Sequence, residues 1–590
     1  MCSKPAPSFP PASVGLSFRR LLLAAVVLIL MVADARAALQ VRVEGIEEPL
    51  LGNVLALLTL QRERETSGLG EGHVRRYFRR APAEIRKALE PYGYYAVQMD
   101  ARLEESGGDW LAWFRIEPGE PLRYRTVTVS LIGAGEQDAV LNEALTGFPL
   151  QQGQVAVHSD YEAAKAGLQK LAIEQGYLDA VYQRHELRID PAAGYAEVQL
   201  LLDSGPQYRF GELVFAPGKL SEELLRRYVT FKPGQPYSYR RLLDLQRALE
   251  DSDYFAQVEV VPLSEQAQGA VVPVQVDLET HKRNKYSVGL GFGTDTGLRG
   301  LLGWENRRVN RYGHRMGASL RGSEIGSELK ANYSLPLANP RSDRLEFTAG
   351  IVDEDTDTTD STLHKFAIGR RVARGRWRET LSLSYEREDY NVGLTDESTS
   401  LLIPGISYSQ VRADNRLVAN RGWRLQFDLR GAAEQLLSDT SFVQSELRGK
   451  WIHGLGERGR IITRAEAGTT WIDEDNLLPV SVRFFAGGDQ SVRGYDYQEL
   501  GPRDASGDVV GGRHRVFGSL EYEHRIKGNW GLAAFVDTGN AFDSFSDGLE
   551  TGAGIGLRWK SPIGMVRIDV ASAVSQDNGL RLHFTLGPDL

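Results

Sequence analysis

The second half of the chain alternates apolar and polar side chains with a period of two, as β-strands do. In KYSVGLGFG, residues 285–293, the side chains of Tyr286, Val288, Leu290 and Phe292 share one face. Two later segments follow the same rule with Trp423, Leu425, Phe427 and Leu429, and with Leu582, Phe584 and Leu586. Helical periodicity is almost absent here, so we expect a long series of strands over residues 282–590.

The first half, residues 38–281, instead joins helical patterns to strands and repeats this unit. Each unit has apolar residues at i, i+3 and i+4, then a turn with an aromatic residue, then an alternating strand. The repeats are EIRKALEPYGYYAVQMDARL (84–103), YEAAKAGLQKLAIEQGYLDAVYQRHEL (161–187) and YRRLLDLQRALEDSDYFAQVEVVPL (239–263). We therefore expect three tandem α+β modules over residues 38–120, 121–205 and 206–281.

Connections between the C-terminal strands alternate between short and long, which is typical of an up-and-down membrane barrel. SPIG (561–564) and KGN (527–529) are short, whereas TGNAFDSFSDGLETG and the segment around GYDYQELGP are long. At about 19 residues per strand and connection, this half predicts about 16 antiparallel strands. A soluble sandwich with one wet face is the alternative, but the recurring aromatic-rich apolar face favours a transmembrane β-barrel.

The N-terminus has the features of an export signal. Arg19 and Arg20 precede the apolar run LLLAAVVLILMV, and Ala35-Arg36-Ala37 follows as a cleavage site, so we expect a signal peptide over residues 1–37. A retained membrane anchor is the alternative, although it needs a longer apolar span. Cleavage would remove Cys2, the single cysteine, which excludes disulfides and thiolate metal sites from the mature chain.

The charge of the chain argues against a nucleic-acid partner. The net charge is −9, and cleavage of the signal peptide would make it more negative by three. An acidic chain without a basic stripe is a poor ligand for a phosphate backbone.

A glycine-rich segment, FFAGGDQSVRGYDYQELGP (484–502), lies in the expected external loop between barrel strands 11 and 12. Glycines permit close backbone approach, so this loop could fold back into the lumen. Its central Arg493 would then need carboxylate partners. On the next two strands, alternation turns Glu521 and Asp537 inward, and we expect them to bind Arg493. A solvated loop arginine is the alternative.

These residues resemble the BamA/TamA outer-membrane assembly-factor family, and the likeness extends over essentially the whole chain beyond residue 37. GGDQSVRGYDY is similar to the family's VRG(F/Y) loop motif, with Gly487, Gly488, Asp489, Val492, Gly494 and Tyr495 as its members here. In that family the arginine contacts acidic residues on neighbouring strands. The three N-terminal repeats resemble POTRA domains, with unrelated ferredoxin-like repeats as the alternative. Three modules rather than five are typical of the TamA branch.

The resemblance implies an outer-membrane insertion factor of a Gram-negative bacterium, with POTRA modules in the periplasm. Its implied partners are a TamB-like inner-membrane-anchored periplasmic protein, unfolded outer-membrane and autotransporter clients, and the lipid bilayer. A two-partner-secretion exporter of the same superfamily is the alternative; such exporters usually carry two modules.

In this family, clients are implied to enter at a lateral seam between the first and last barrel strands. Gly289, Gly291 and Gly293 weaken the first strand, and Phe584 and Leu586 lie on the last. An opened seam would offer edge hydrogen bonds to an incoming strand. The alternative is that these glycines only ease the curvature of the barrel.

Features of an enzyme, a metal site or a cofactor site are weak. The ten histidines are scattered, and none has a partner at ligand spacing such as H-x-x-x-H. GLGFG and GAGIG lie within alternating strands, unlike dinucleotide-binding loops. We therefore expect no catalytic residues, no metal and no cofactor.

Overall fold

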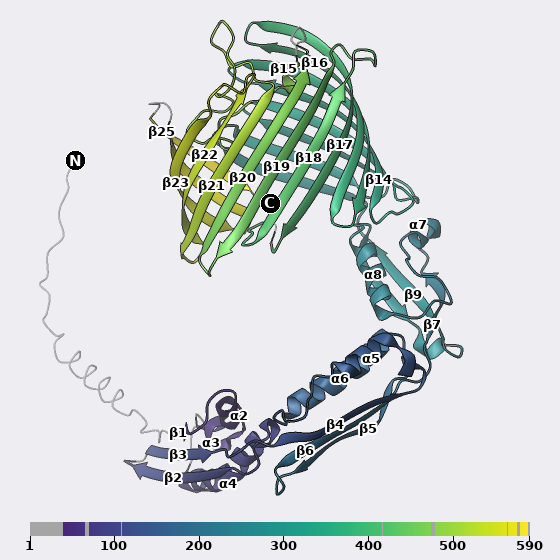
Figure 1. Ribbon diagram of the computed structural model, residues 1–590, viewed down its shortest axis with the longest axis vertical. Coiled ribbons are helices and arrows are strands. Elements are labelled where there is room, and N and C mark those ends of the chain that lie inside the picture. Colours follow the sequence, from purple (N-terminus) through teal and green to yellow (C-terminus); the bar gives the residue numbers. More distant parts are fainter. Residues whose placement is uncertain are drawn as a thin grey trace, which may run out of the picture. The chain divides into compact units, whose positions relative to one another are not determined.

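The computed structural model describes residues 39–64, 70–107, 109–415, 417–473, 478–562, 564–574 and 579–587. The predicted signal peptide lies outside these ranges. Within them, no helix combines the length and the apolar character needed to cross a membrane. The architecture has three small α+β modules followed by a sheet of 16 strands, as the sequence predicts (Figure 1).

Each module packs helices along a three-stranded sheet whose strands run in the order first, third, second. The first contains β1 (Leu39–Glu44), α2 (Leu50–Leu57), α3 (Thr59–Arg62), α4 (Glu71–Leu89), η1 (Glu90–Tyr92), β2 (Gln98–Ser106) and β3 (Asp109–Glu117). The second contains β4 (Arg123–Ile132), η2 (Ala134–Gln137), α5 (Ala139–Thr146), α6 (His158–Glu174), β5 (Val181–Asp190) and β6 (Tyr195–Asp203). The third contains β7 (Arg209–Phe215), α7 (Glu222–Arg226), α8 (Tyr239–Glu250), β8 (Phe255–Pro262), η3 (Ser264–Gln266) and β9 (Val271–Thr280).

The central strand of each module buries every second side chain against a helix. Trp110, Ala112, Phe114 and Ile116 of β3 are buried in one core with Val74, Ile85 and Ala88 of α4. Ala196, Val198, Leu200 and Leu202 of β6 pack likewise with Ala164 and Leu168 of α6. In the third module the buried residues are Val272, Val274 and Val276 of β9, and Leu242, Leu245 and Leu249 of α8. The period-two and helical patterns therefore meet at each core.

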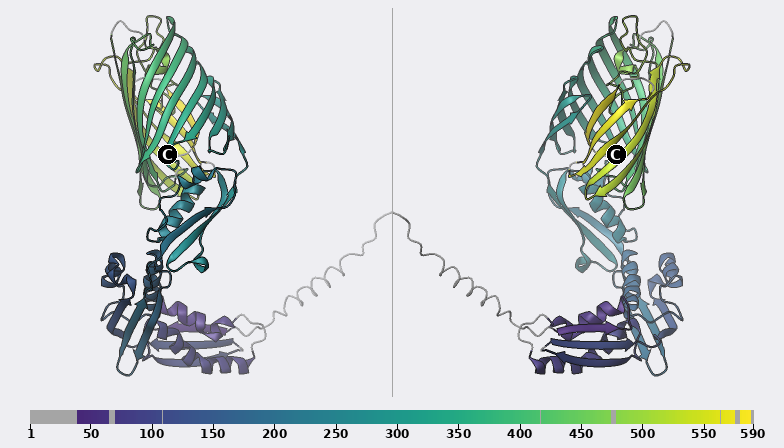
Figure 2. Two further views of the ribbon diagram at one scale, coloured as in Figure 1. Left: turned by 90° about the vertical axis from the view of Figure 1, so that its right-hand side faces the viewer. Right: turned by 90° about the vertical axis from the view of Figure 1, so that its left-hand side faces the viewer.

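The barrel strands all pair antiparallel with their neighbours in chain order, and Figure 2 shows them tilted around a cylinder. The first eight are β10 (Asn284–Gly293), β11 (Gly297–Asn306), β12 (Arg315–Ser323), β13 (Gly326–Pro336), β14 (Asp343–Asp355), β15 (Thr359–Arg374), β16 (Trp377–Val392) and β17 (Thr395–Ala413). The other eight are β18 (Gly422–Ala432), β19 (Phe442–Leu455), β20 (Gly459–Ile472), β21 (His514–Lys527), β22 (Trp530–Phe542), β23 (Glu550–Ser561), β24 (Gly564–Ala573) and β25 (Leu580–Gly587).

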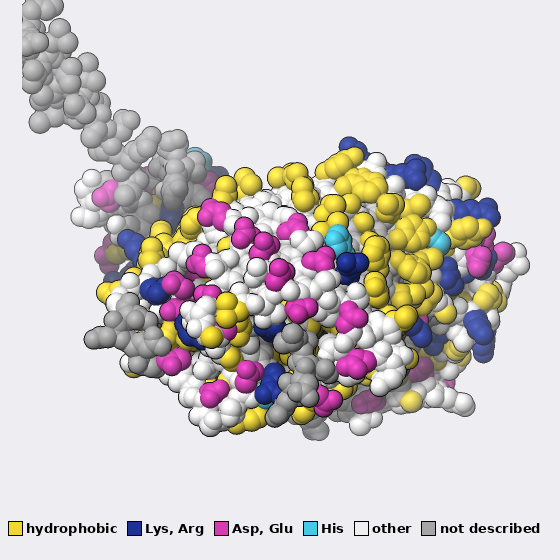
Figure 3. Space-filling view, turned by 90° about the horizontal axis from the view of Figure 1, so that it is seen from above, with side chains coloured by type: hydrophobic (Ala, Val, Ile, Leu, Met, Phe, Trp, Pro, Cys, Tyr) yellow, Lys and Arg dark blue, Asp and Glu magenta, His cyan; other side chains and the backbone are white. Residues whose placement is uncertain are grey.

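The outer face of the barrel carries large apolar side chains in contact with solvent. On β21 and β22 these are Leu520, Tyr522, Trp530, Leu532 and Val536, all between 43% and 53% exposed. Figure 3 shows hydrophobic side chains gathered along one flank, whereas acidic side chains dot the surface turned to the viewer. An apolar exterior suits a lipid environment, and the ladders between consecutive strands pair their backbone groups there.

The third module contacts two connections at the base of the barrel. Arg307, just after β11, donates to Asp253 at 2.9 Å, and the carbonyl oxygen of Arg311 accepts from the backbone of Ser221 at 2.8 Å. Arg227 donates to the carbonyl oxygen of Leu337, just after β13, at 2.9 Å. The first barrel hairpins are therefore tied to this module at the end where β10 begins.

We predict that a charge on the outer face destabilises the barrel. Val536→Arg near the middle of β22 should lower the free energy of unfolding by about 2–4 kcal/mol, because the guanidinium would lie in hydrocarbon. Ser382→Arg is the control, since Ser382 lies between the outward Leu381 and Leu383 and so faces the lumen. Urea unfolding in lipid vesicles measures both variants, and equal losses would contradict an outward-facing lipid surface.

Candidate functional site

The connection between β20 and β21, the eleventh and twelfth barrel strands, packs against the inner wall of the barrel. It contains a short 3-10 turn, η4 (Val480–Val482), and then the glycine-rich motif. Its apolar side chains form a small core with the wall, made of Phe484, Ala486, Val492, Tyr495 and Leu500 from the loop and Phe517, Ala541 and Ala573 from the strands. The Tyr495 hydroxyl also donates to Glu550 at 2.8 Å. The loop is therefore an inserted, packed element.

Arg493 lies at the centre of this loop and is only 3% exposed. Its Nε and Nη2 donate to the two oxygens of Asp537, at 2.7 and 3.0 Å, in a bidentate pair. Its Nη1 donates to Glu521 and to Asp569, each at 2.9 Å. The guanidinium also lies 3.3 Å from the ring centroid of Phe535. Carboxylates on three strands thus hold one cation of the loop.

Two glycines let the loop backbone reach the wall. Gly494 has φ of 102°, and a Cβ there would meet backbone atoms of Ser572 and Ala573 within 3.0 Å. On the facing strand, a Cβ at Gly552 would come 1.8 Å from the carbonyl oxygen of Arg493. No side chain fits at either position, so the depth at which Arg493 inserts depends on both.

Further ion pairs extend the network from Arg493 to Arg558 and Arg460. Arg558 of β23 donates to Glu521 at 2.7 Å and to Glu523 at 3.1 Å, and it also contacts Asp569. Arg460 of β20 donates to Glu523 at 2.6 Å. Arg464 lies 3.7 Å from Asp537. These contacts set four guanidinium groups against four carboxylates, and such pairing is what buried ions require.

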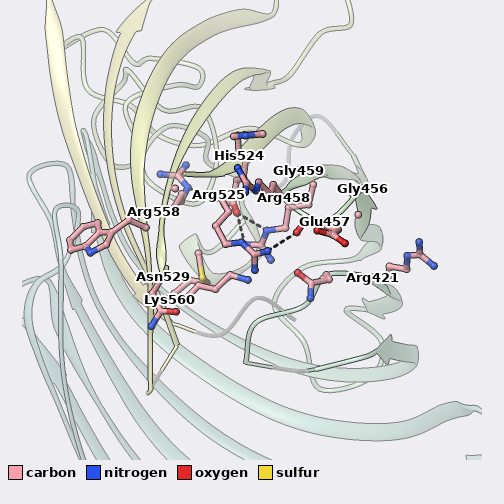
Figure 4. A pocket seen from close by; sticks show the side chains of 17 residues that line it. Arg421, Gly456, Glu457, Arg458, Gly459, His524, Arg525, Asn529, Arg558 and Lys560 are labelled. Atoms are coloured by element: carbon pink, nitrogen blue, oxygen red, sulfur yellow. Dashed lines mark hydrogen bonds and ion pairs between the residues drawn. The ribbon is translucent and has the colours of Figure 1, made fainter. Parts of the chain in front are cut away.

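A basic pocket of about 380 Å³ opens beneath this network (Figure 4). Arg460, Glu523 and Arg558 of the ion network line it, together with Arg421, Arg458, Arg525 and Lys560. Arg525 donates to the carbonyl oxygen of Glu457 at 2.8 Å. Arg421 directly precedes β18, Arg458 lies in the turn between β19 and β20, and Arg525 and Lys560 lie near the ends of β21 and β23. All four lie at the end of the barrel that contacts the third module.

The first and last barrel strands, β10 and β25, lie beside each other at the expected seam. Among the described residues, no backbone ladder joins β10 to β25, and the two strands are the ends of the sheet order. The rings of Phe292 and Phe584 lie 5.8 Å apart across the gap. Leu290 of β10 is 81% exposed and Leu582 of β25 is 58% exposed. The right-hand view of Figure 2 shows the yellow C-terminal strands near the teal strands with which the barrel begins.

The expected seam glycines do not all have the same surroundings. A Cβ at Gly291 would meet nothing within 4 Å, whereas one at Gly289 would come 3.3 Å from Leu301. A Cβ at Gly293 would come 2.6 Å from the flexible end of Arg299. Close packing therefore does not require glycine at position 291. Leu586 belongs to β25 and pairs with Val566 on β24.

Near the seam, the expected loop residue Asp489 lies beside Asp295 and His583, and the donor atoms of the three lie within 4.8 Å of one another. Asp295 occupies the turn between β10 and β11. Burial, and then the charge of Asp489, raise the pKa of Asp295 to about 6. The backbone N–H of Asp489 donates to Asp295 at 2.6 Å and partly offsets that rise.

The structure brings Arg493, Glu521 and Asp537 together and seats Gly487, Gly488, Val492, Gly494 and Tyr495 in the same loop. Sequence reasoning missed Asp569, Arg558, Glu523 and His583. The first three could have been found from strand alternation. Ile555, Leu557 and Val570 face outward, so Arg558 and Asp569 beside them face inward. Glu523 lies two residues after the inward Glu521 and therefore faces inward as well. His583 also alternates inward, but its contact with Asp489 crosses 94 residues of sequence and needs the fold.

Comparison with known proteins places the two halves in one family. Residues 283–589 match the Omp85 superfamily domain, residues 40–118 match the POTRA domain described as TamA domain 1, and residues 208–280 match a POTRA repeat described as a surface antigen variable number repeat.

Two curated relatives are outer membrane protein assembly factors named BamA. The protein of Nitratidesulfovibrio vulgaris is 23% identical over 64% of this chain and 50% of its own length. The protein of Neorickettsia risticii is 22% identical over 88% of this chain and 73% of its own. The chain thus spans only half the length of the first. The crystal structure of BamA from Haemophilus ducreyi lacking POTRA domains 1–3 has a TM-score of 0.68 at 16% identity, covering 78% of this chain and 99% of that one.

We predict that Arg493→Ala frees the loop from the lumen. Removing the cation takes the bidentate partner from Asp537 and leaves Glu521 and Asp569 with Arg558 as their remaining ion-pair partner. Losing one partner of a buried ion pair costs about 3–5 kcal/mol. Protease added from outside should then cut within residues 483–513 faster than in the unsubstituted protein. Arg503→Ala in the same loop is the matched control, because the Arg503 guanidinium donates to carbonyl oxygens of the loop itself, those of Glu499 and Gly507. Equal cleavage of all three proteins would show that Arg493 does not hold the loop.

Proposed function

The chain belongs to the Omp85 superfamily, and from that premise we propose that it inserts β-barrel proteins into the outer membrane. Its barrel lies in the outer membrane of a Gram-negative bacterium, and its POTRA domains lie in the periplasm. The proposed activity needs no covalent chemistry and no cofactor. It consists of presenting a strand edge to an unfolded client inside the bilayer.

The observation that carries this proposal is the missing ladder between β10 and β25 among the described residues. A strand edge inside hydrocarbon has unpaired N–H and C=O groups, which favours pairing with any available strand. A client strand could add to such an edge by β-augmentation, so that the client sheet grows from the seam. Gly291, with open space around it, makes β10 the more deformable edge.

We further propose that the chain is of the TamA type within the superfamily. Three modules precede the barrel, and the first matches the TamA-type POTRA domain over residues 40–118. We divide the chain as the sequence predicts, with modules over residues 38–120, 121–205 and 206–281 and the barrel over 282–590. The proposed partner is a TamB-like protein anchored in the inner membrane, and the proposed clients include autotransporters.

The ion network contributes to this function as a proposed anchor. Arg493, Glu521 and Asp537 would keep the loop in the lumen while the seam opens, so that the wall of β21–β24 stays rigid. Seam movement would then be confined to β10 and β25. A two-partner-secretion exporter would instead move its client through the lumen, which this packed loop narrows.

We predict that a disulfide across the seam stops client assembly. Phe292→Cys combined with Phe584→Cys places two thiols where the rings now lie 5.8 Å apart. After oxidation in lipid vesicles, folding of a urea-denatured outer-membrane client should fall to the level of empty vesicles, and reductant should restore it. The measurement is the fraction of client that resists protease.

The control for this experiment is a disulfide inside the barrel wall. Leu532→Cys with Leu557→Cys joins directly paired residues of β22 and β23 and leaves the seam free. Undiminished client folding with the seam disulfide fully formed would contradict the proposed gate.

A second prediction concerns the partner. Deletion of residues 39–117, the first module, should abolish recovery of a large inner-membrane-anchored protein when the chain is purified from detergent-solubilised membranes. The barrel should still fold, because its strands and ion network lie outside the deletion. Failure of the full chain to recover such a partner would favour the exporter alternative over the TamA type.

A further inference from the structure

Asp489 of the inserted loop lies between the two strands that form the seam. On one side, its carboxylate accepts a hydrogen bond from Thr294, in the turn after β10, at 2.9 Å. On the other side, its Oδ1 accepts from His583 Nδ1 of β25 at 2.6 Å. One carboxylate of the loop thus binds both edges of the barrel.

His583 is fixed by hydrogen bonds on both ring nitrogens. The backbone N–H of Gly494 donates to Nε2 at 2.9 Å, so the ring hydrogen lies on Nδ1 and points at Asp489. Gly494 directly follows Arg493, which ties the imidazole to the ion network through one peptide unit. Both His583 and Asp489 are buried, each less than 9% exposed.

Two more contacts support the same junction. The Thr294 hydroxyl accepts from the backbone N–H of Phe584 at 2.8 Å, which is a direct hydrogen bond from β25 to the β10–β11 turn. Arg581 of β25 forms an ion pair with Asp496 of the loop. The loop therefore contacts the last strand at His583 and Arg581, and the turn of the first hairpin at Thr294 and Asp295.

These residues are arranged as a hydrogen-bonded junction. Although Asp295, Asp489 and His583 together resemble a metal-ligand set, both nitrogens of His583 and both oxygens of Asp489 already have partners within the protein. A metal ion would have to displace these bonds, whereas strand separation breaks them directly.

We propose that Asp489, Thr294 and His583 form a clasp that holds the seam closed from inside, and that loop movement at Asp489 must accompany seam opening. Because the described residues of β10 and β25 share no ladder, these side chains carry the polar contacts between the edges. An incoming strand that pairs with either edge would displace Phe584 from Thr294 and loosen His583. The hydrogen-bonded clasp itself does not depend on the proposed function; only the statement that clients enter at this seam does.

The test measures the seam itself, without a client. Spin labels on Val288→Cys and Leu582→Cys report the separation of β10 and β25 from outward-facing positions, in a background carrying Cys2→Ser. In lipid vesicles the unsubstituted clasp should give one narrow distance distribution. Asp489→Asn and Thr294→Val should each add a population longer by about 5 Å or more, which is one strand spacing.

Matched controls exist for both substitutions. Thr296→Val lies in the same turn and removes a hydroxyl that has no hydrogen-bond partner among the described residues. Asp508→Asn removes the same charge from the same loop, where the Asp508 carboxylate accepts from the Ser506 hydroxyl at 2.9 Å. Both controls should keep the narrow distribution.

A distribution that stays narrow in Asp489→Asn and in Thr294→Val overturns the clasp. If Asp489→Asn fails to fold, Thr294→Val alone decides, since it changes one hydroxyl to a methyl group of the same size. Client folding, measured separately on the same variants, tests the proposed function. A widened seam with unchanged client folding would contradict the gate and leave the clasp in place.

Discussion

A buried guanidinium group imposes the main constraint on this barrel. Arg493 is carried into the lumen by a loop, and a charge in such a site is tolerated only beside opposite charges. Glu521, Asp537 and Asp569 supply them from β21, β22 and β24. Three features meet this requirement. The loop lies inside the lumen, the three carboxylates face inward from their strands, and Gly494 and Gly552 let the loop backbone approach the wall. Losing any single carboxylate would leave the remaining charges unbalanced.

The ion network also distinguishes two parts of the barrel, the strands that it joins and the two edge strands β10 and β25. Strands β20–β24 are joined to the loop and to one another by ion pairs as well as by ladders. Beyond β24 the loop holds β25 through His583 and Arg581. Between β10 and β25 the described residues form no ladder, and the contacts at this seam are made through the side chains of Thr294, Asp489 and His583. The proposed insertion function needs both properties, since an edge that opens must be held by a wall that stays in place.

Much of this organisation could be predicted from sequence. Period-two alternation gives the strands and their lipid face, and it also places Glu521 and Asp537 inward. Alternation cannot say which inward residues meet, because that depends on register and on how far the loop descends. Asp569 was therefore missed, although alternation along its strand shows that it faces inward. His583 was missed because a lone histidine has no spacing signal. Whether β10 and β25 form a ladder, which their described residues do not, depends on barrel closure, and a single sequence does not encode closure locally.

A double-mutant cycle tests the ion network most directly. Arg493→Gln, Asp537→Asn and the pair together would be unfolded with urea in lipid vesicles, and the three losses of free energy compared with the unsubstituted protein. The account predicts a coupling energy of about 2 kcal/mol or more between the two residues, because the pair is buried and bidentate. A coupling energy near zero would mean that Arg493 and Asp537 stabilise the barrel independently, and the loop would then need another anchor.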